Sequence, residues 1–154
     1  MTHDYYGTKR ITAWPEEKDG KQGYAVKYAD GYVSWSPADT FEAAYQPLTA
    51  LSFGHALAAL KSGERVARAG WNGKGMWIGL TPGSVFAAKH AKCGHAAAFR
   101  AAELDPEDDV ELLPHIDMRA ADGSMVIGWL ASQSDMLADD WYIVDLETGG
   151  PTTL

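Results

Sequence analysis

The sequence predicts an α+β fold made of short antiparallel strands and short helices. Two Asp-Gly pairs, at 30–31 and 122–123, lie between alternating strand-like runs, and an amphipathic helical pattern covers 53–60. Because glycine adopts a positive φ at little cost, Asp-Gly between alternating runs predicts a hairpin. With 154 residues, the chain can form one compact domain or two small ones.

Residues 1–48 are expected to form a small β-β-β-α module. The expected elements are strands at 9–14, 24–28 and 32–35, a charged loop at 16–23 and a helix at 37–45. Ser36 is the expected N-cap of that helix, with Pro37 at its first position. Aromatic residues on alternate strand positions usually pack a small sheet onto its helix, so we expect them to form the core of this module; an interaction surface is the alternative. These residues are Tyr5, Tyr6, Trp14, Tyr24, Tyr28, Tyr32, Trp35, Phe41 and Tyr45.

Residues 49–147 are expected to form the main domain. Ser52 begins a helix whose apolar stripe is Phe53, Ala56, Leu57 and Leu60, and Gly63 ends it. Strands are expected at 64–68, 76–80, 113–119, 125–129 and 141–144. Between them, the insertion 84–112 is expected to hold one or two short Ala-rich helices at 84–102 and an acidic connector at 105–111, and 148–154 is expected to be a flexible tail.

Composition excludes some classes of function. A net charge of −8 argues against the basic face that polymeric nucleic acid needs, but it leaves a small anionic ligand possible. The chain has one cysteine, Cys93, which excludes an internal disulfide and fits a reducing cytosol. The first residues lack a secretion signal and no run suits a membrane span, so we expect a cytoplasmic protein without a membrane partner.

No motif for catalysis, metal or cofactor binding is evident. His90, Cys93, His95 and His115 lack the paired spacing of a zinc site, and the acidic run at 105–111 is more simply a solvated loop. We therefore expect no catalytic residue, no metal and no cofactor.

Two tryptophans stand beside polar groups in the main domain. Trp71 precedes Asn72-Gly73, a hairpin-turn signal, and Lys74; Trp129 precedes the predicted N-cap Ser132, with Asp135 at the capping-box position. Indole faces can stack on flat heterocycles, and amide and hydroxyl groups suit base edges and ribose. The pattern alone favours the simpler interpretation, in which both tryptophans cover a core.

Two longer motifs add a resemblance. The segments 70–74 (GWNGK) and 129–137 (WLASQSDML), within 51–83 and 113–145, resemble the second type of Thoeris anti-defence protein of phages and prophages. The segment 1–48 also looks like a module common in phage proteins, with no activity known to us.

The resemblance implies a non-catalytic sponge. Family members sequester glyco-cyclic ADP-ribose signals made by TIR proteins and, for some members, cyclic dinucleotides, which blocks the defence effector. It implies a twisted antiparallel sheet with an inserted helix, and homodimers or homotetramers with ligand pockets at subunit interfaces. The implied ligand-binding residues are Trp71, Asn72, Gly73, Lys74, Trp129, Ser132, Gln133, Ser134 and Asp135.

The resemblance implies that Trp71 stacks on adenine or lies against ribose. It also implies that the segment from Trp129 to Asp135 forms the opposite wall of the pocket, with free N–H groups toward phosphate. Trp77 is expected in the ordinary core. The insertion 84–112 is longer than the loop we associate with this position and could cover the pocket. Two alternatives stay open: an enzyme that cleaves such nucleotides through Asp117 or Asp135, and a phage protein-interaction module based on 1–48.

Overall fold

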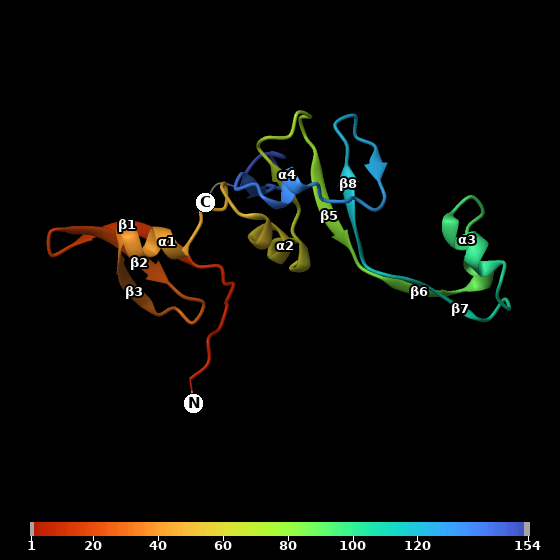
Figure 1. Cartoon of the computed structure of the whole chain (residues 1–154), viewed down its shortest axis with the longest axis horizontal. Helices are drawn as coiled ribbons and strands as arrows, with labels where there is room; N and C mark the ends of the chain where they lie inside the picture. The colour runs from red at the N-terminus through yellow and green to blue at the C-terminus, as the bar shows by residue number, and fades with distance from the viewer. Residues whose placement is uncertain (1, 153–154) are drawn as a thin grey trace.

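The computed structural model describes residues 2–152 of the chain. Figure 1 shows three parts along the long axis: the N-terminal module, the main domain with its sheet, and an arm that ends in a small helix. The α+β class is confirmed, since helices and antiparallel sheets are both present. Among the described residues, none of the helices has the length and apolar character that crossing a bilayer requires.

The N-terminal module has the predicted β-β-β-α order. Its elements are β1 (Thr12–Lys18), β2 (Lys21–Lys27), β3 (Val33–Pro37) and α1 (Ala38–Ala44), and its antiparallel sheet has the order β1-β2-β3. The predicted loop at 16–23 is wrong, because β1 continues to Lys18 and turns at Asp19-Gly20, both with positive φ. Pro15 fits within β1 because β1 is an edge strand. The predicted Ser36 cap is also wrong: Ser36 lies in β3 and Pro37 is the N-cap, with no side-chain cap.

The aromatic core predicted for this module forms only in part. Tyr24 stacks on Phe41 at 4.2 Å between ring centroids, and Phe41 stacks on Tyr45 at 4.9 Å, which joins the sheet to α1. In contrast, four of the expected core residues are exposed: Tyr5, Tyr6, Trp14 and Tyr32. The reason is that one seven-residue helix covers a single face of the sheet, while Tyr5 and Tyr6 precede β1 in a segment without secondary structure.

The main domain is a five-stranded antiparallel sheet with the helix α2 packed on one face. The strands are β4 (Val66–Arg68), β5 (Trp77–Thr81), β8 (His115–Arg119), β9 (Met125–Val126) and β10 (Trp141–Ile143), in the order β10-β4-β5-β8-β9. The helix α2 (Phe53–Lys61) begins at Ser52, whose hydroxyl accepts from the His55 N–H, and ends before Gly63 at φ 90°. Its predicted stripe packs on the sheet, with Ala56 and Leu60 fully buried.

The core of this domain lies between α2 and the sheet. Its fully buried side chains include Leu60, Val66, Ile78 and Trp141. The predicted Asp-Gly turn at 122–123 connects β8 to β9, with Gly123 at φ 90°. The short helix α4 (Gln133–Met136) follows β9 and precedes β10. The main elements of this domain therefore occur in the predicted order.

The insertion forms an arm, which differs from the prediction. A two-stranded sheet of β6 (Ser84–Ala87) and β7 (Asp109–Leu112) carries a 3₁₀ turn (Ala88–His90) and the helix α3 (Ala96–Ala101). The helix predicted from residue 84 and the connector predicted through Glu111 are thus wrong where the two strands pair, because Phe86 lies opposite Val110 in their ladder. Figure 1 shows the arm pointing away from the five-stranded sheet, so within one chain it does not cover the Trp71 loop.

The chain end folds back on β10. Pro151 forms a bridge with Val144, and the Thr152 N–H donates to the Ile143 carbonyl at 2.8 Å. The segment expected to be a flexible tail is therefore held against the sheet as far as Thr152, and residues 153 and 154 lie outside the described residues.

Candidate functional site

Three tryptophans meet edge-to-face at one end of the core. Trp71 comes from the loop after β4, Trp129 follows β9, and Trp141 belongs to β10. The ring centroids are 6.2 Å apart for Trp71 and Trp129, 5.4 Å for Trp71 and Trp141, and 6.3 Å for Trp129 and Trp141. Trp141 is fully buried, whereas Trp71 and Trp129 are half-buried and pack on the core from outside. The two sequence motifs therefore lie side by side in one chain.

Asp135 connects this cluster to α4. Its Oδ1 accepts from the Trp71 indole N–H at 3.0 Å and from Arg68 Nη1 at 2.9 Å, and its Oδ2 accepts from the Ser132 N–H and hydroxyl. Its main-chain carbonyl accepts from the Trp141 indole N–H at 2.9 Å. The predicted capping box is confirmed, with Asp in the place where Glu or Gln is usual.

The environment of Asp135 keeps its carboxyl group ionised. Burial raises the pKa of Asp135, but hydrogen bonds from Ser132, Arg68 and Trp71 outweigh this effect and lower the pKa to about 2. All four acceptor contacts of the carboxylate are thus made within the chain, which gives this predicted ligand-binding residue a structural role of its own.

Arg68 and Asp140 extend the contacts of Asp135. Arg68 Nε donates to Asp140 Oδ1 at 2.8 Å, while Asp140 Oδ2 accepts from the Gly70 N–H at 2.7 Å. The hydrogen bond from Arg68, opposed by burial, lowers the pKa of Asp140, and the same bond raises the pKa of Arg68. We call Arg68, Asp135 and Asp140 the Arg68 network. Sequence reasoning missed Arg68 and Asp140; the available signal was a lone charge closing the apolar strand Val66–Arg68.

The loop between β4 and β5 is not the hairpin turn that Asn72-Gly73 predicts. Among the described residues, Asp19 is the one non-glycine residue with positive φ, and the positive φ in this loop belongs to Gly75 at 71° rather than Gly73. Gly73 is instead required by close packing, because a Cβ there would lie 2.7 Å from the Cβ of Ala121. Arg119 Nη1 donates to the Gly75 carbonyl at 2.6 Å, which holds the end of the loop.

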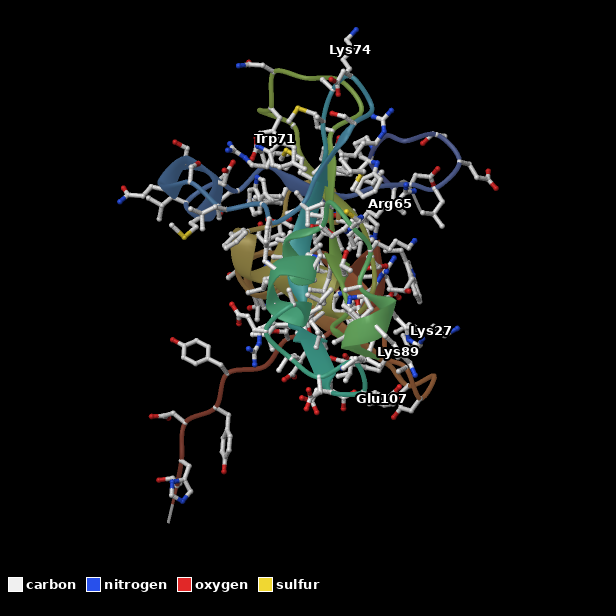
Figure 2. All side chains as sticks on the ribbon, turned by 90° about the vertical axis from the view of Figure 1, so that its right-hand side faces the viewer. Lys27, Arg65, Trp71, Lys74, Lys89 and Glu107 are labelled. Carbon is white, nitrogen blue, oxygen red and sulfur yellow. The ribbon has the colours of Figure 1, made fainter. Side chains whose placement is uncertain are left out.

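The polar residues of the two motifs are exposed around the tryptophans. Asn72 and Lys74 are exposed in the loop, and Figure 2 shows Lys74 extending from its tip away from Trp71. Ser132, Gln133 and Ser134 are exposed at the start of α4. Their predicted roles in ligand binding stay predictions, and two hollows on the described part of the chain are lined by other residues.

Both hollows lie beside the segment 63–65. The first, of about 260 Å³, is lined by Arg65, Trp77, Thr81 and Asp117 among others, and the second, of about 510 Å³, lies between Arg10, Arg65 and the 143–147 segment. The expectation that Trp77 is core is wrong, since Ile78 takes the buried position in β5 and the neighbouring residue faces the other side. Trp77 is half-buried beneath the Arg65 guanidinium, 5.0 Å from its ring centroid, and Figure 2 shows Arg65 and Trp71 on opposite sides of the sheet.

The remaining titratable candidates do not gather into a second site. Within residues 2–152, no group of three or more His, Cys, Asp or Glu side chains is placed to hold a metal ion. Asp117 is buried; it accepts from the Gly128 N–H at 2.9 Å and from the Thr81 hydroxyl, and His115 Nε2 lies 3.5 Å from it. Like the Asp135 carboxylate, the Asp117 carboxylate already accepts hydrogen bonds from its own chain.

Comparisons with known proteins match the main domain and its arm. Residues 51–144 match the model of a family described as "Thoeris anti-defense 2-like domain". A relative from Bacillus phage SP01, named Thoeris anti-defense 2, is 36% identical over 96 residues, which cover 62% of this chain and 97% of the relative. The match includes Trp71, Trp129 and the whole Arg68 network. The chain therefore belongs to the Thoeris anti-defense 2-like family, and this membership supports a role in phage anti-defence.

Proposed function

We propose that this protein is a phage sponge that binds cyclic nucleotide immune signals without degrading them. Its ligand is glyco-cyclic ADP-ribose made by TIR proteins, with cyclic dinucleotides as a further ligand class, and sequestration blocks the bacterial defence effector. The observation that carries the proposal is the contact between Trp71 and Trp129, 6.2 Å apart between centroids, in the two motifs of the matched region.

The surroundings of the tryptophans suit a nucleotide. The Trp71 indole N–H, at the edge of the ring, is already bonded to Asp135, so a face of the ring is the part available for stacking. Stacking on an aromatic side chain contributes about 1–3 kcal/mol per base. Exposed amide and hydroxyl groups from Asn72, Ser132 and Gln133 stand nearby in sequence, and such groups bind base edges and ribose. Lys74 adds a positive charge at the tip of the same loop.

Binding without catalysis is favoured by the state of the carboxylates. A general acid or base must exchange a proton near neutral pH, and the Asp135 pKa of about 2 does not suit that task. Asp117, the other candidate, is buried and accepts two hydrogen bonds from its own chain. The alternative, a nucleotide-cleaving enzyme, therefore lacks a free carboxylate in the two motifs.

A second copy of the chain would complete the pocket. Apolar side chains beside the second motif are strongly exposed: Leu130 is 89% exposed, Leu137 80% and Met136 46%. Neighbouring apolar side chains left in water are typical of a protein interface, and most such assemblies are symmetric. We infer a homodimer or homotetramer in which this surface is covered and the ligand lies between subunits.

The test separates binding from turnover. The protein is mixed with glyco-cyclic ADP-ribose, removed by filtration and then heated, and the filtrate and the released material are analysed by mass spectrometry. Depletion of the ligand followed by release of the unchanged molecule supports the proposal. A linear or otherwise cleaved product formed in excess over the protein would establish an enzyme instead, and no depletion at all would contradict both.

A further inference from the structure

We propose that Arg68 and Asp140 are positioning residues, which fasten the Trp71 loop to the Trp129–Asp135 wall of the candidate ligand site. The inference rests on the proposed function, because it concerns how the two walls of that site are held together. Neither residue belongs to the two sequence motifs, and neither is expected to touch the ligand.

The contacts form a closed ring between two distant segments. Arg68 is the last residue of β4, and its guanidinium bonds both carboxylates, Asp135 at 2.9 Å and Asp140 at 2.8 Å. Each carboxylate also accepts a hydrogen bond from the loop that follows β4. Asp140 accepts from the Gly70 N–H at 2.7 Å, and Asp135 accepts from the Trp71 indole N–H at 3.0 Å. The backbone of the loop and the ring of Trp71 are therefore tied separately to the segment 135–140.

The chemistry of this ring requires an arginine. A guanidinium has five donors in a fixed plane and can serve two carboxylates, whereas an ammonium group is a single point of charge. Only 15% of the Arg68 side chain and 12% of the Asp135 side chain is exposed, so solvent screens this pair weakly. Holding the two carboxylates close to each other would be unfavourable without the cation between them.

The Arg68 network holds the loop rather than the hydrophobic core. The hydrophobic cluster beneath α2 consists of other residues, such as Leu60, Val66 and Ile78, and the Asp140 side chain is 34% exposed at its margin. At its far end the loop is held by the Arg119 bond to the Gly75 carbonyl. Losing the Asp140 side chain would therefore loosen the start of the loop, where the main-chain bond from the Ala69 N–H to the Asp140 carbonyl at 3.1 Å remains, while leaving the sheet and α2 in place.

The experiment compares three variants of the full chain. Asp140→Ala removes the acceptor for Gly70 and Arg68, Asp140→Asn keeps an oxygen acceptor, and Asp139→Ala changes the exposed neighbour as a control. Affinity for glyco-cyclic ADP-ribose is measured by calorimetry. Hydrogen exchange of the indole N–H groups is followed by NMR in the same samples, where Trp141, bonded to the Asp135 carbonyl, and Trp35, bonded to the Glu16 carbonyl, are internal references.

We expect Asp140→Ala to weaken ligand binding and to accelerate exchange of the Trp71 indole N–H, each by about tenfold, because a hydrogen bond to a charged group is lost. The references should keep their rates, Asp140→Asn should recover part of the affinity, and Asp139→Ala should match the parent. Equal acceleration at Trp71 and Trp141, or unchanged Trp71 exchange in Asp140→Ala, would overturn the positioning role. If the parent protein binds no ligand, the proposed function fails, and the indole exchange rates still decide whether the Arg68 network fastens the loop.

Discussion

The indole Nε1 of Trp71 lies 3.0 Å from the carboxylate Oδ1 of Asp135, and this bond joins the segments 70–74 and 129–137. The donor of this hydrogen bond is the N–H at the edge of the Trp71 indole, and the same indole packs edge-to-face on Trp141. Trp71 therefore contributes to stability as well as to the candidate site, and substitutions there must separate the two contributions.

Replacing Trp71 with Phe should keep an aromatic face but remove the N–H donor and part of the ring that packs on Trp141. We expect the free energy of unfolding to fall by about 2 kcal/mol, because the lost hydrogen bond goes to a charged carboxylate, and ligand binding to be weakened but retained. Trp71→Ala also removes the packing on Trp141 and should cost about 3 kcal/mol. Urea unfolding followed by calorimetry on the folded variants measures both effects.

Trp14→Phe is the matched control, because Trp14 is exposed in the N-terminal module. It should change neither stability nor ligand affinity measurably. If Trp71→Ala is as stable as the parent, the packing described here is unimportant, and if it binds ligand as tightly, Trp71 is no part of the site.

Acid should weaken the fold through Asp135. Its pKa is about 2 in the folded protein against 3.8 for the free group, so its contribution to stability is present above pH 3.8 and is lost as the pH falls through 2. The lowered pKa corresponds to about 2 kcal/mol. The difference in the free energy of unfolding between the parent and Asp135→Asn should therefore shrink between pH 4 and pH 2, as measured by urea unfolding.

Asp139→Asn, which alters an exposed neighbouring carboxylate, should show no such convergence. A constant gap between the parent and Asp135→Asn over this range would mean that the Asp135 charge does not stabilise the fold.

Two glycine substitutions should act in opposite directions. Gly73→Ala places a methyl group 2.7 Å from the Cβ of Ala121, so the loop must shift, and both stability and ligand affinity should fall. Gly54→Ala, within α2, meets nothing closer than 3.7 Å and should stabilise the protein by up to about 1 kcal/mol. The midpoints of thermal unfolding of the two variants measure both effects. A Gly73→Ala variant as stable as the parent would show that the loop accommodates a Cβ at this position.

A charge on the exposed apolar surface should prevent assembly. We expect Leu130→Glu and Leu137→Glu each to reduce the molar mass measured by light scattering, because burying an unpaired carboxylate in an interface is unfavourable. Leu146→Glu is the control, since Leu146 is equally exposed, at 80%, but lies after β10 and away from the second motif. If all three variants keep the mass of the parent, the interface lies elsewhere.

Several elements could be predicted because local signals agreed with the tertiary structure. Ser52, Gly63 and the stripe including Leu60 defined α2 from both ends, and the capping box at Ser132 predicted the start of α4. These signals act within a few residues, so they do not depend on distant contacts.

Several failures share one physical cause, which is pairing with a distant segment. The Ala-rich segment 84–102 predicts helix because alanine favours helices, and α3 forms within it, but β6 is a strand because β7 pairs with it. Trp77 is expected in the core but is half-buried outside it, because which of two alternating strand positions is buried depends on the face that α2 covers. The charge of Arg68 is visible in the sequence, but its partners Asp135 and Asp140 could not be identified because they lie 67 and 72 residues away.

The single cysteine of the chain has a practical consequence. Cys93 is exposed at the outer end of the arm, between the 3₁₀ turn and α3, and Figure 1 shows that this end points away from the main domain. A thiol-reactive fluorophore would therefore label each molecule once, at a position remote from Trp71 and Trp129. The labelled protein would report its rotational diffusion as copies associate, so assembly could be followed at low concentration with the candidate site unmodified.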